Sequence, residues 1–256
     1  MTTTYLVSQI AESINSNEFF LEYQPKLNLA TNKIYGVEAL VRWNHRELGR
    51  IPPNDFIPIL EKTDSIKLLT NWVLKTVIED MVEWKSKGID LVISVNVCPR
   101  DLEDDNFSLN LFNLLEKNNV EFEKIELEIT ETDLIKGIDK VSKVLKILKV
   151  RGIKVSIDDF GTGYSSLSYL NSLPVNEIKI DKSFVDFLVK DKGKQDLLKY
   201  IIELAHILNK FVIAEGVEDE ETINLLKLLN CENVQGYFIS KPISKENLTT
   251  FLKNNN

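Results

Sequence analysis

Carboxylate and amide side chains stand at the ends of successive short apolar runs in this 256-residue sequence. The set comprises Glu38, Asn96, Glu128, Asp158, Asp159, Glu215, Glu218 and Gln235. A lysine, Lys179, lies inside another such run. Oxygen ligands without histidine or cysteine select hard cations such as Mg²⁺ or Mn²⁺ over Zn²⁺, and the whole chain has 2 histidines. The residue types therefore predict a Mg²⁺ or Mn²⁺ site rather than a zinc site.

The number of acidic side chains indicates more than one ion. The set holds six carboxylates, and a single Mg²⁺ takes one or two because it keeps several of its waters. Two ions about 3.5–4 Å apart activate a water and stabilise the attacking and leaving oxygens of a phosphodiester. The pattern therefore predicts two-metal hydrolysis. Bound cations would also allow a chain of net charge −8 to hold an anionic substrate.

Each of these residues also has a purely structural interpretation. A single acid in a charged chain is usually solvated, but Glu38 and Glu128 have apolar neighbours. An unpaired charge is costly there, so their alternative is a buried ion pair. Asp158 and Asp159 could instead cap a helix. Because adjacent strand residues point to opposite faces, only a turn after the strand lets both reach one site. Lys179 could be a surface strand lysine.

The elements that must position these residues alternate regularly from about Ile89 onward. Short apolar runs typical of strands span Asp90 to Val97, Lys124 to Thr130, Lys154 to Ile157, Glu177 to Ile180, Phe211 to Ala214 and Asn233 to Gln235. Stretches with helical spacing lie between them and include Val141 to Val150, Leu197 to Leu208 and Asp219 to Leu229. Repeated strand–helix–strand units predict a parallel sheet.

The first third of the chain departs from this alternation. Phe19 to Leu29 and Lys33 to Trp43 both have strand character, and only Ala30 to Asn32 separate them. A parallel crossover needs a dozen or more residues, so this pair must be antiparallel. With these two, the count reaches eight strands, which predicts an α/β fold: a (β/α)8 barrel of the TIM type with an antiparallel first strand. A doubly wound sheet is the alternative, but its glycine-rich fingerprint is absent.

We expect a single domain over residues 1–256, because no linker or low-complexity tract divides the sequence. An N-terminal helix at about 5–16 would precede a barrel at about 19–252. The net charge of −8 disfavours DNA as a partner. The N-terminus lacks a secretory pattern, no apolar run is long enough to span a bilayer, and Cys98 and Cys231 follow no metal or redox spacing. We therefore expect a cytoplasmic protein without membrane insertion.

Several motifs, in this order, resemble those of the EAL-domain cyclic-di-GMP phosphodiesterases from about Phe19 to Leu252. The matching strings are Tyr23-Gln24-Pro25, Glu38-Ala39-Leu40 followed by Val41-Arg42-Trp43, Ser94-Val95-Asn96, Glu128-Ile129-Thr130-Glu131, Asp158-Asp159-Phe160-Gly161-Thr162-Gly163-Tyr164-Ser165-Ser166-Leu167, Lys179-Ile180-Asp181, Ala214-Glu215-Gly216-Val217-Glu218 and Gln235-Gly236-Tyr237. The resemblance implies hydrolysis of cyclic di-GMP to linear pGpG with two Mg²⁺ or Mn²⁺ ions per active site. It also implies the same barrel.

The resemblance also implies the ligands of both ions. The first ion would be held by Glu38, Asn96, Glu128 and Asp158. The second would be held by Asp158, Asp159 and Glu215. Lys179 would touch the nucleophilic water, and Glu218 and Gln235 would orient waters of the ions, Gln235 thus acting as a ligand through water.

Further residues are implied at the substrate and around the site. Arg42 resembles the phosphate contact and Leu40 its apolar neighbour, while Gln24 and Asp181 match substrate or supporting contacts. Glu131 resembles the glutamate that anchors the loop from Phe160 to Ser166, which the family ties to metal binding and to homodimer formation. His45-Arg46 and Cys98-Pro99 depart from the usual pattern, and neither pair provides a ligand.

Three alternatives remain open at this point. The chain could be a two-metal phosphodiesterase, or a catalytically silent EAL module that acts as a cyclic-di-GMP receptor or protein-interaction domain. A Mg²⁺-dependent enolising barrel is a third, although it would need a positioned base and fewer carboxylates. The first is favoured because Glu38, Asp159, Lys179 and Glu215 are all present. The chain carries no recognisable sensory domain, so we expect regulation by a partner protein, by oligomerisation or by a domain outside it.

Overall fold

A computed structural model gives the fold over residues 3–136, 138–162, 170–171 and 173–255. Its strands are β1 (Phe19–Asn28), β2 (Lys33–His45), β3 (Gly49–Ile51), β4 (Val92–Asn96), β5 (Ile125–Thr130), β6 (Lys154–Phe160), β7 (Glu177–Ile180), β8 (Phe211–Ala214) and β9 (Asn233–Gln235). Strand order runs β1-β9-β8-β7-β6-β5-β4-β2, and β1 also pairs with β2. The sheet therefore closes on itself, and the predicted eight-stranded α/β barrel is confirmed.

Strand β1 is the reversed strand of the barrel. It runs antiparallel to β2 on one side and to β9 on the other, whereas β2 and β4 through β9 pair in parallel. Only four residues, Leu29 to Asn32, connect Asn28 to Lys33, and so short a connection requires this direction. The short strand β3 was not predicted; it pairs antiparallel with the end of β2 and extends that strand beyond the barrel.

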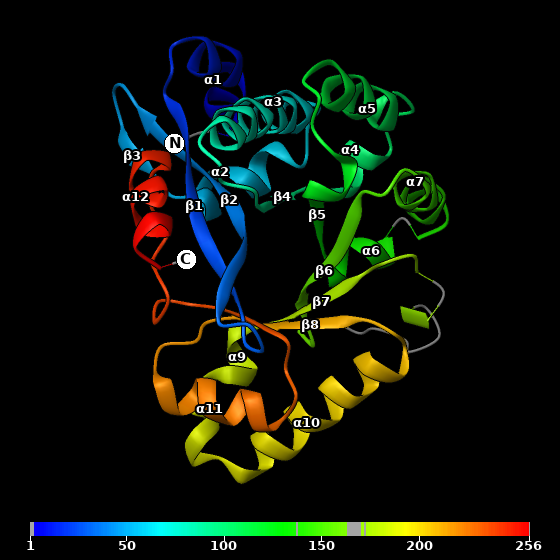
Figure 1. Ribbon diagram of the computed structural model, residues 1–256. Coiled ribbons are helices and arrows are strands. Elements are labelled where there is room, and N and C mark those ends of the chain that lie inside the picture. Colours follow the sequence, from blue (N-terminus) through cyan, green and yellow to red (C-terminus); the bar gives the residue numbers. More distant parts are fainter. Residues whose placement is uncertain (1–2, 137, 163–169, 172, 256) are drawn as a thin grey trace.

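Helices surround the barrel (Figure 1). The described ones are α1 (Thr3–Asn15), α2 (Pro53–Leu60), α3 (Ser65–Ser86), α4 (Pro99–Leu102), α5 (Phe107–Lys117), α6 (Glu131–Lys136), α7 (Ile138–Val150), α9 (Lys182–Val185), α10 (Lys192–Ile207), α11 (Glu220–Leu228) and α12 (Lys245–Asn255), with 3₁₀ turns at Phe122–Lys124 and Leu188–Lys190. The predicted N-terminal helix corresponds to α1, which packs on α2 and α3 outside the barrel. In the described part of the chain, no helix is both long and apolar enough to cross a bilayer.

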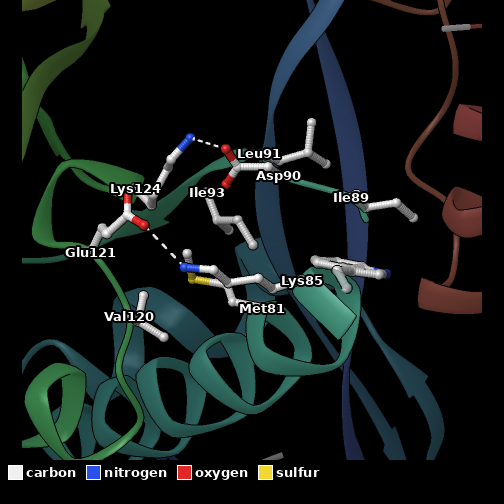
Figure 2. Close-up of a pocket in the computed structure, with 10 residues that line it drawn as sticks. Met81, Lys85, Ile89, Asp90, Leu91, Ile93, Val120, Glu121 and Lys124 are labelled. Atoms are coloured by element: carbon white, nitrogen blue, oxygen red, sulfur yellow. Dashed lines mark hydrogen bonds and ion pairs between the residues drawn. The ribbon is translucent and has the colours of Figure 1, made fainter. Parts of the chain in front are cut away.

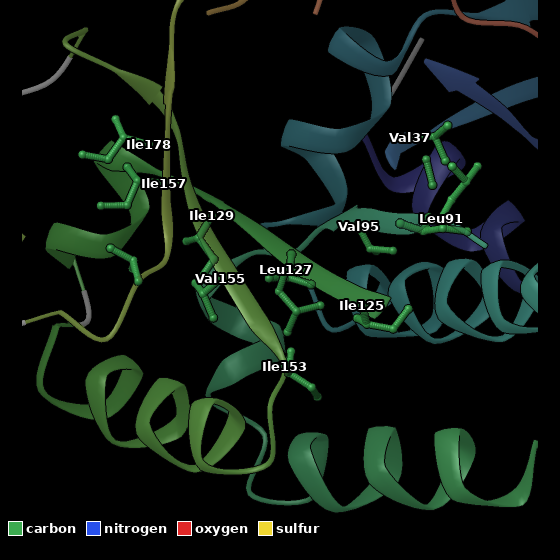
Figure 3. Packing of buried hydrophobic residues seen from close by; sticks show 14 of the residues in the cluster. Val37, Leu91, Val95, Ile125, Leu127, Ile129, Ile153, Val155, Ile157 and Ile178 are labelled. Atoms are coloured by element: carbon green, nitrogen blue, oxygen red, sulfur yellow. The ribbon is translucent and has the colours of Figure 1, made fainter. Parts of the chain in front are cut away.

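Alternation along the strands places apolar side chains between sheet and helices. In β5, Ile125, Leu127 and Ile129 are buried in the main apolar cluster, as Figure 3 shows. The alternate residues Glu126 and Glu128 therefore point to the opposite side, the barrel interior, because successive strand side chains face opposite ways. A second apolar cluster joins α1, α2 and α3 to the ends of β1 and β2. The apolar core thus lies outside the strands, and the barrel interior is polar.

Candidate active site

The predicted site residues converge at the end of the barrel where the parallel strands finish, which we call the mouth. Asn96 ends β4, Gln235 ends β9, and Glu215 directly follows β8. Glu38 lies in β2 and Glu128 in β5, each near that same end. The other contributors are Asp158 and Asp159 of β6 and Lys179 of β7. Barrel enzymes build their sites at this face, so the strand topology itself brings these side chains together.

Lys179 occupies the centre of the mouth. Its Nζ lies 2.6 Å from Glu128, 2.7 Å from Glu215 and 2.9 Å from Asp158. Glu38 is 3.6 Å away. The lysine side chain is 1% exposed, so the ammonium is held entirely by carboxylates. Burial alone would lower the pKa of Lys179, but these surrounding carboxylates raise it well above its ordinary value. Lys179 is therefore a fixed cation, and the surface-lysine interpretation is wrong.

A bulge in β6 directs two adjacent carboxylates to one place. The pairing of β6 with β7 shifts between Ile157 and Phe160. Asp159 adopts a left-handed backbone with φ 54°, which a non-glycine residue rarely takes. Oxygens of Asp158, Asp159 and Glu215 lie within 4.8 Å of one another. A bulge can redirect side chains in this way. We had expected a turn after the strand to bring both aspartates to one site, and the bulge within β6 does so instead.

Amide side chains hold Glu38 in place. Asn96 Nδ2 donates to Glu38 Oε1 at 2.8 Å, and Gln235 Nε2 donates to Glu38 Oε2 at 2.7 Å. Gln235 Nε2 also lies 3.0 Å from Gln24 Oε1, which links β9 to β1. Within the described residues, the buried Gln235 Oε1 has no hydrogen-bond partner. An orphaned oxygen beside a set of carboxylates fits a site that holds hydrated cations.

The electrostatics of the mouth also fit cation binding. Burial raises the pKa of Glu215 to about 8; Lys179 opposes this rise, and the neighbouring Asp158 and Glu38 add to it. Burial likewise raises the pKa of Glu38 despite Lys179, and burial followed by Asp158 raises that of Asp159. Carboxylates crowded this closely repel one another, and a bound divalent cation would relieve that repulsion. The donor set therefore suits one or more oxygen-loving metal ions.

Glu128 behaves differently from its neighbours because two lysines hold it. Burial would raise its pKa, but Lys179 and Lys26 bring it down to about 2. Lys26 Nζ lies 2.7 Å from Glu128 Oε1 and 3.0 Å from Glu126 Oε2. Our sequence analysis missed Lys26 and Glu126. Each lies two residues from a predicted site residue on the same strand, Gln24 or Glu128, so the period of two could have placed both inside the barrel.

Two cavities adjoin at the mouth. One of about 590 Å³ is lined by Leu40, Arg42, Asn96, Asp158 and Asp159, and it extends to α2 and α3. The other, of about 270 Å³, also borders Leu40 and Asp158 and is lined further by Glu38, Lys179 and Glu215. Together they fall within the range of small-molecule sites. Asp158 borders both cavities, so a ligand that fills both would pass over this carboxylate of the candidate metal site.

Several predicted residues line the rim of these cavities. Glu218 borders the smaller one and pairs at 2.7 Å with Lys182, which sequence analysis had not named. Arg42 borders the larger one, where Glu22 Oε2 accepts from its Nε at 2.7 Å. Asp181 follows β7 and caps α9, and its charge is close enough to Asp159 to help raise the pKa of that carboxyl. These side chains lie around the mouth and are not among the carboxylates that contact Lys179.

The loop after β6 is described only in part. Glu131 Oε2, at the start of α6, accepts from the backbone N–H of Gly161 at 2.7 Å. Residues 163–166 of the predicted metal and dimer loop lie outside the described residues. A further pocket, drawn in Figure 2, lies between the end of α3 and the start of β4, away from the mouth, and its volume of about 20 Å³ suits no ligand larger than a water.

The geometry agrees with what comparison with known proteins shows. The family model of the EAL domain matches residues 7–242. The chain belongs to the EAL domain family. This EAL domain is 37% identical over 249 residues to cyclic di-GMP phosphodiesterase PA2567 of Pseudomonas aeruginosa, covering 97% of this chain and 42% of the relative. It is 36% identical to cyclic di-GMP phosphodiesterase PdeR of Escherichia coli, covering 93% of this chain and 36% of that one.

Solved structures give the same assignment. The PaMucR phosphodiesterase in complex with c-di-GMP matches with a TM-score of 0.89 at 35% identity, covering 95% of this chain and 99% of that chain. An EAL domain protein from Listeria monocytogenes matches with a TM-score of 0.79 at 34% identity, covering 96% and 97%. The chain spans less than half the length of the two curated relatives, so they carry further sequence outside the EAL domain.

Proposed function

We propose that this EAL domain is a phosphodiesterase that hydrolyses cyclic di-GMP to linear pGpG with two Mg²⁺ or Mn²⁺ ions. The observation that carries the proposal is the convergence of the whole carboxylate, amide and lysine set on one barrel mouth beside cavities of small-molecule size. The names of the relatives and the bound c-di-GMP of the PaMucR complex supply the substrate. Cyclic di-GMP is anionic, so Lys179 and the metal ions that the mouth would bind suit this substrate.

The residues divide into two ligand groups. Glu38, Asn96, Glu128 and Asp158 would hold one ion, and Asp158, Asp159 and Glu215 the other, with Gln235 reaching an ion through water. Two such ions, when bound, supply a water that is easily deprotonated and positive charge for both the attacking and the leaving oxygen. We assign Asp158 to both groups because its carboxylate lies within 4.8 Å of oxygens of Asp159 and Glu215 and shares Lys179 with Glu128.

The protein's own cations and rim residues orient the reactants. Lys179 keeps its ammonium charge in this environment. One of its N–H groups donates to Glu128, and metal ions that drew Asp158 and Glu215 toward themselves would leave a second N–H to donate to the attacking water. Arg42 and Leu40 border the larger cavity and would receive a phosphate and an apolar face of the nucleotide. Gln24, Asp181 and Glu218 would support these contacts from the rim. Water adds to phosphorus while the bond to the ribose 3′-oxygen breaks, which leaves a 5′-phosphate and a free 3′-hydroxyl.

The decisive experiment follows the nucleotide itself. Purified protein is incubated with cyclic di-GMP and Mn²⁺ or Mg²⁺, and the products are separated by ion-exchange chromatography with an EDTA control. We expect pGpG to appear only when the metal is available. Cyclic di-GMP that is bound, as measured by calorimetry, but returned intact would refute hydrolysis and support the receptor alternative. Product formation that EDTA does not stop would refute the metal-ligand roles.

A further inference from the structure

A second buried lysine lies inside the barrel below the mouth. The Lys26 side chain is 1% exposed, and its Nζ has three partners: Ser94 Oγ at 2.5 Å, Glu128 Oε1 at 2.7 Å and Glu126 Oε2 at 3.0 Å. Ser94 Oγ also donates to Glu126 Oε2 at 2.6 Å. All three donors of the ammonium are therefore used inside the protein. None of the roles assigned to the mouth above involves this lysine.

Lys26 and Lys179 bind opposite oxygens of one carboxylate. Glu128 is fully buried, its Oε1 faces Lys26, and its Oε2 lies 2.6 Å from Lys179 Nζ. Strand register explains the arrangement: Asn96 pairs with Glu128 at the level of the mouth, and Ser94 pairs with Glu126 two residues below. Lys26, which follows Gln24 by two residues on the reversed β1, lies at the lower level. It therefore reaches Glu128 from beneath.

We propose that Lys26 is a positioning residue that fixes the Glu128 carboxylate for metal binding. The inference rests on the proposed function, in which Glu128 is a ligand. With Oε1 held by Lys26, the carboxylate cannot rotate about its Cγ–Cδ bond, and Oε2 is the oxygen offered to the mouth. Lys26 also balances Glu126, so Glu128 does not face an unpaired negative charge. Partners that orient a metal ligand typically change metal affinity by about 10–100-fold.

The test is the affinity of the protein for Mn²⁺ measured without substrate. Lys26→Met keeps an unbranched side chain as far as Cε and removes the charge and the donors. We expect isothermal titration calorimetry to show a dissociation constant for Mn²⁺ raised at least tenfold. At saturating Mn²⁺ we expect the KM for cyclic di-GMP to change less than twofold, because Lys26 touches neither cavity. A Mn²⁺ dissociation constant equal to that of the wild type would overturn the proposal.

A double-mutant cycle tests whether Lys26 acts through Glu128. Once Glu128→Gln removes the carboxylate, the position of that side chain no longer depends on an ion pair. Lys26→Met should then weaken Mn²⁺ binding no more than twofold in the Glu128→Gln background, against at least tenfold in the wild type. Equal effects in both backgrounds would show that Lys26 does not act through Glu128 and would contradict the proposal.

The chain offers a matched control for the loss of a buried lysine. Lys210 is also buried, but its Nζ contacts the backbone oxygens of Leu173 and Val175 at the other end of β8. Lys210→Met should lower the melting temperature and leave the Mn²⁺ affinity unchanged. Should Lys26→Met fail to fold, as judged by circular dichroism, Lys26→Gln is the second variant: it stays polar, but it removes the charge, and its shorter side chain withdraws the donor from Glu128. It should bind Mn²⁺ more weakly than the wild type, and unchanged affinity in this variant would refute the proposal.

The outcomes separate this inference from the function on which it rests. A wild-type protein that binds Mn²⁺ and leaves cyclic di-GMP intact refutes hydrolysis alone, and the affinities of the wild type and Lys26→Met still decide the role of Lys26. Hydrolysis by the wild type together with unchanged Mn²⁺ affinity in the variants refutes the Lys26 role alone. A wild-type protein that binds no Mn²⁺ refutes both.

Discussion

Glu131 Oε2 accepts a hydrogen bond from the backbone N–H of Gly161 at 2.7 Å, which joins the start of α6 to the residues that follow the β6 bulge. Gly161 has a positive φ of 98°, and a Cβ there would lie 2.5 Å from the ring of Phe184. The backbone after Asp159 is therefore held from two sides. The unusual conformation of Asp159 depends on such external support.

This contact predicts the effect of changing Glu131. Glu131→Ala removes the acceptor and should lower kcat/KM for cyclic di-GMP at least tenfold, because Asp159 loses its fixed position and a hydrogen bond to a charged group is worth about 1.5–3 kcal/mol. Glu131→Gln is the control, since its side-chain oxygen can still accept from Gly161 and most activity should remain. Initial rates of pGpG formation measure both. Wild-type rates in Glu131→Ala would show that the contact does not support the site.

Lys179 separates catalysis from metal binding. Lys179→Ala removes the cation that touches Glu128, Asp158 and Glu215, and we expect kcat to fall by about 10²-fold or more, the usual effect of losing one preorganised hydrogen-bond donor. Mn²⁺ should bind as tightly as before or more tightly, because one competing positive charge is gone. Calorimetry and single-turnover rates provide the two measurements. Weaker Mn²⁺ binding with an unchanged rate per bound metal would contradict the water-positioning role.

Arg42 should affect substrate binding more than turnover. Its guanidinium borders the larger cavity and is held by Glu22 at 2.7 Å, so its position is set before substrate arrives. Arg42→Ala should raise the KM for cyclic di-GMP at least tenfold and change kcat less than threefold, the signature of lost ground-state binding. Steady-state kinetics at saturating Mn²⁺ measures both. A fall in kcat with an unchanged KM would place Arg42 in the chemical step.

Glu177 predicts how the stability of the protein depends on pH. Burial, with the nearby Glu126, raises its pKa to about 8, above its ordinary value of about 4.3. Between these values the folded state binds more protons than the unfolded state, so the free energy of unfolding falls as pH rises. Glu177→Gln removes that titration, so the free energy of unfolding of the variant should fall less steeply with pH, by up to about 1.4 kcal/mol per pH unit.

The comparison uses urea unfolding of wild type and Glu177→Gln in EDTA between pH 5 and pH 9. Because both proteins share every other titrating group, the difference between the two curves isolates Glu177. The two proteins should differ in slope below pH 8, and the curves should run parallel at pH 9. Parallel curves over the whole range would show that Glu177 titrates normally in the folded state.

Much of this architecture could be predicted from the sequence because each step had one physical solution. The four residues between Asn28 and Lys33 allow only antiparallel pairing, and the remaining strand–helix alternation then predicts a barrel. The mouth followed because parallel strands end at one face. Strand β3 was missed because three residues, Gly49 to Ile51, are too few to show the alternation of apolar and polar residues that indicates a strand. The bulge at Asp159 was missed because a non-glycine residue gives no sign that it will adopt a positive φ.

The barrel interior was the harder part to predict. Glu126 and Lys26 look like solvent-facing charges when each strand is read alone, because alternation with apolar residues is the usual sign of an exposed face. In this barrel the apolar side chains face the helices, so the charges face inward and must pair. Which charges meet depends on the stagger between strands, and Lys26 lies more than 90 residues from Glu126 and Glu128 in the chain.

Cyclic di-GMP hydrolysis by Glu38→Ala tests the account most directly. Glu38 is buried at the mouth and held by Asn96 and Gln235, so its loss removes a proposed ligand without opening the fold. Glu79, an exposed residue of α3, provides the control. With saturating Mn²⁺, wild type and Glu79→Ala should convert cyclic di-GMP to pGpG at equal rates. Glu38→Ala, with an unchanged circular dichroism spectrum, should form at most about 1% as much. Near wild-type turnover by Glu38→Ala would contradict the placement of the active site at this mouth.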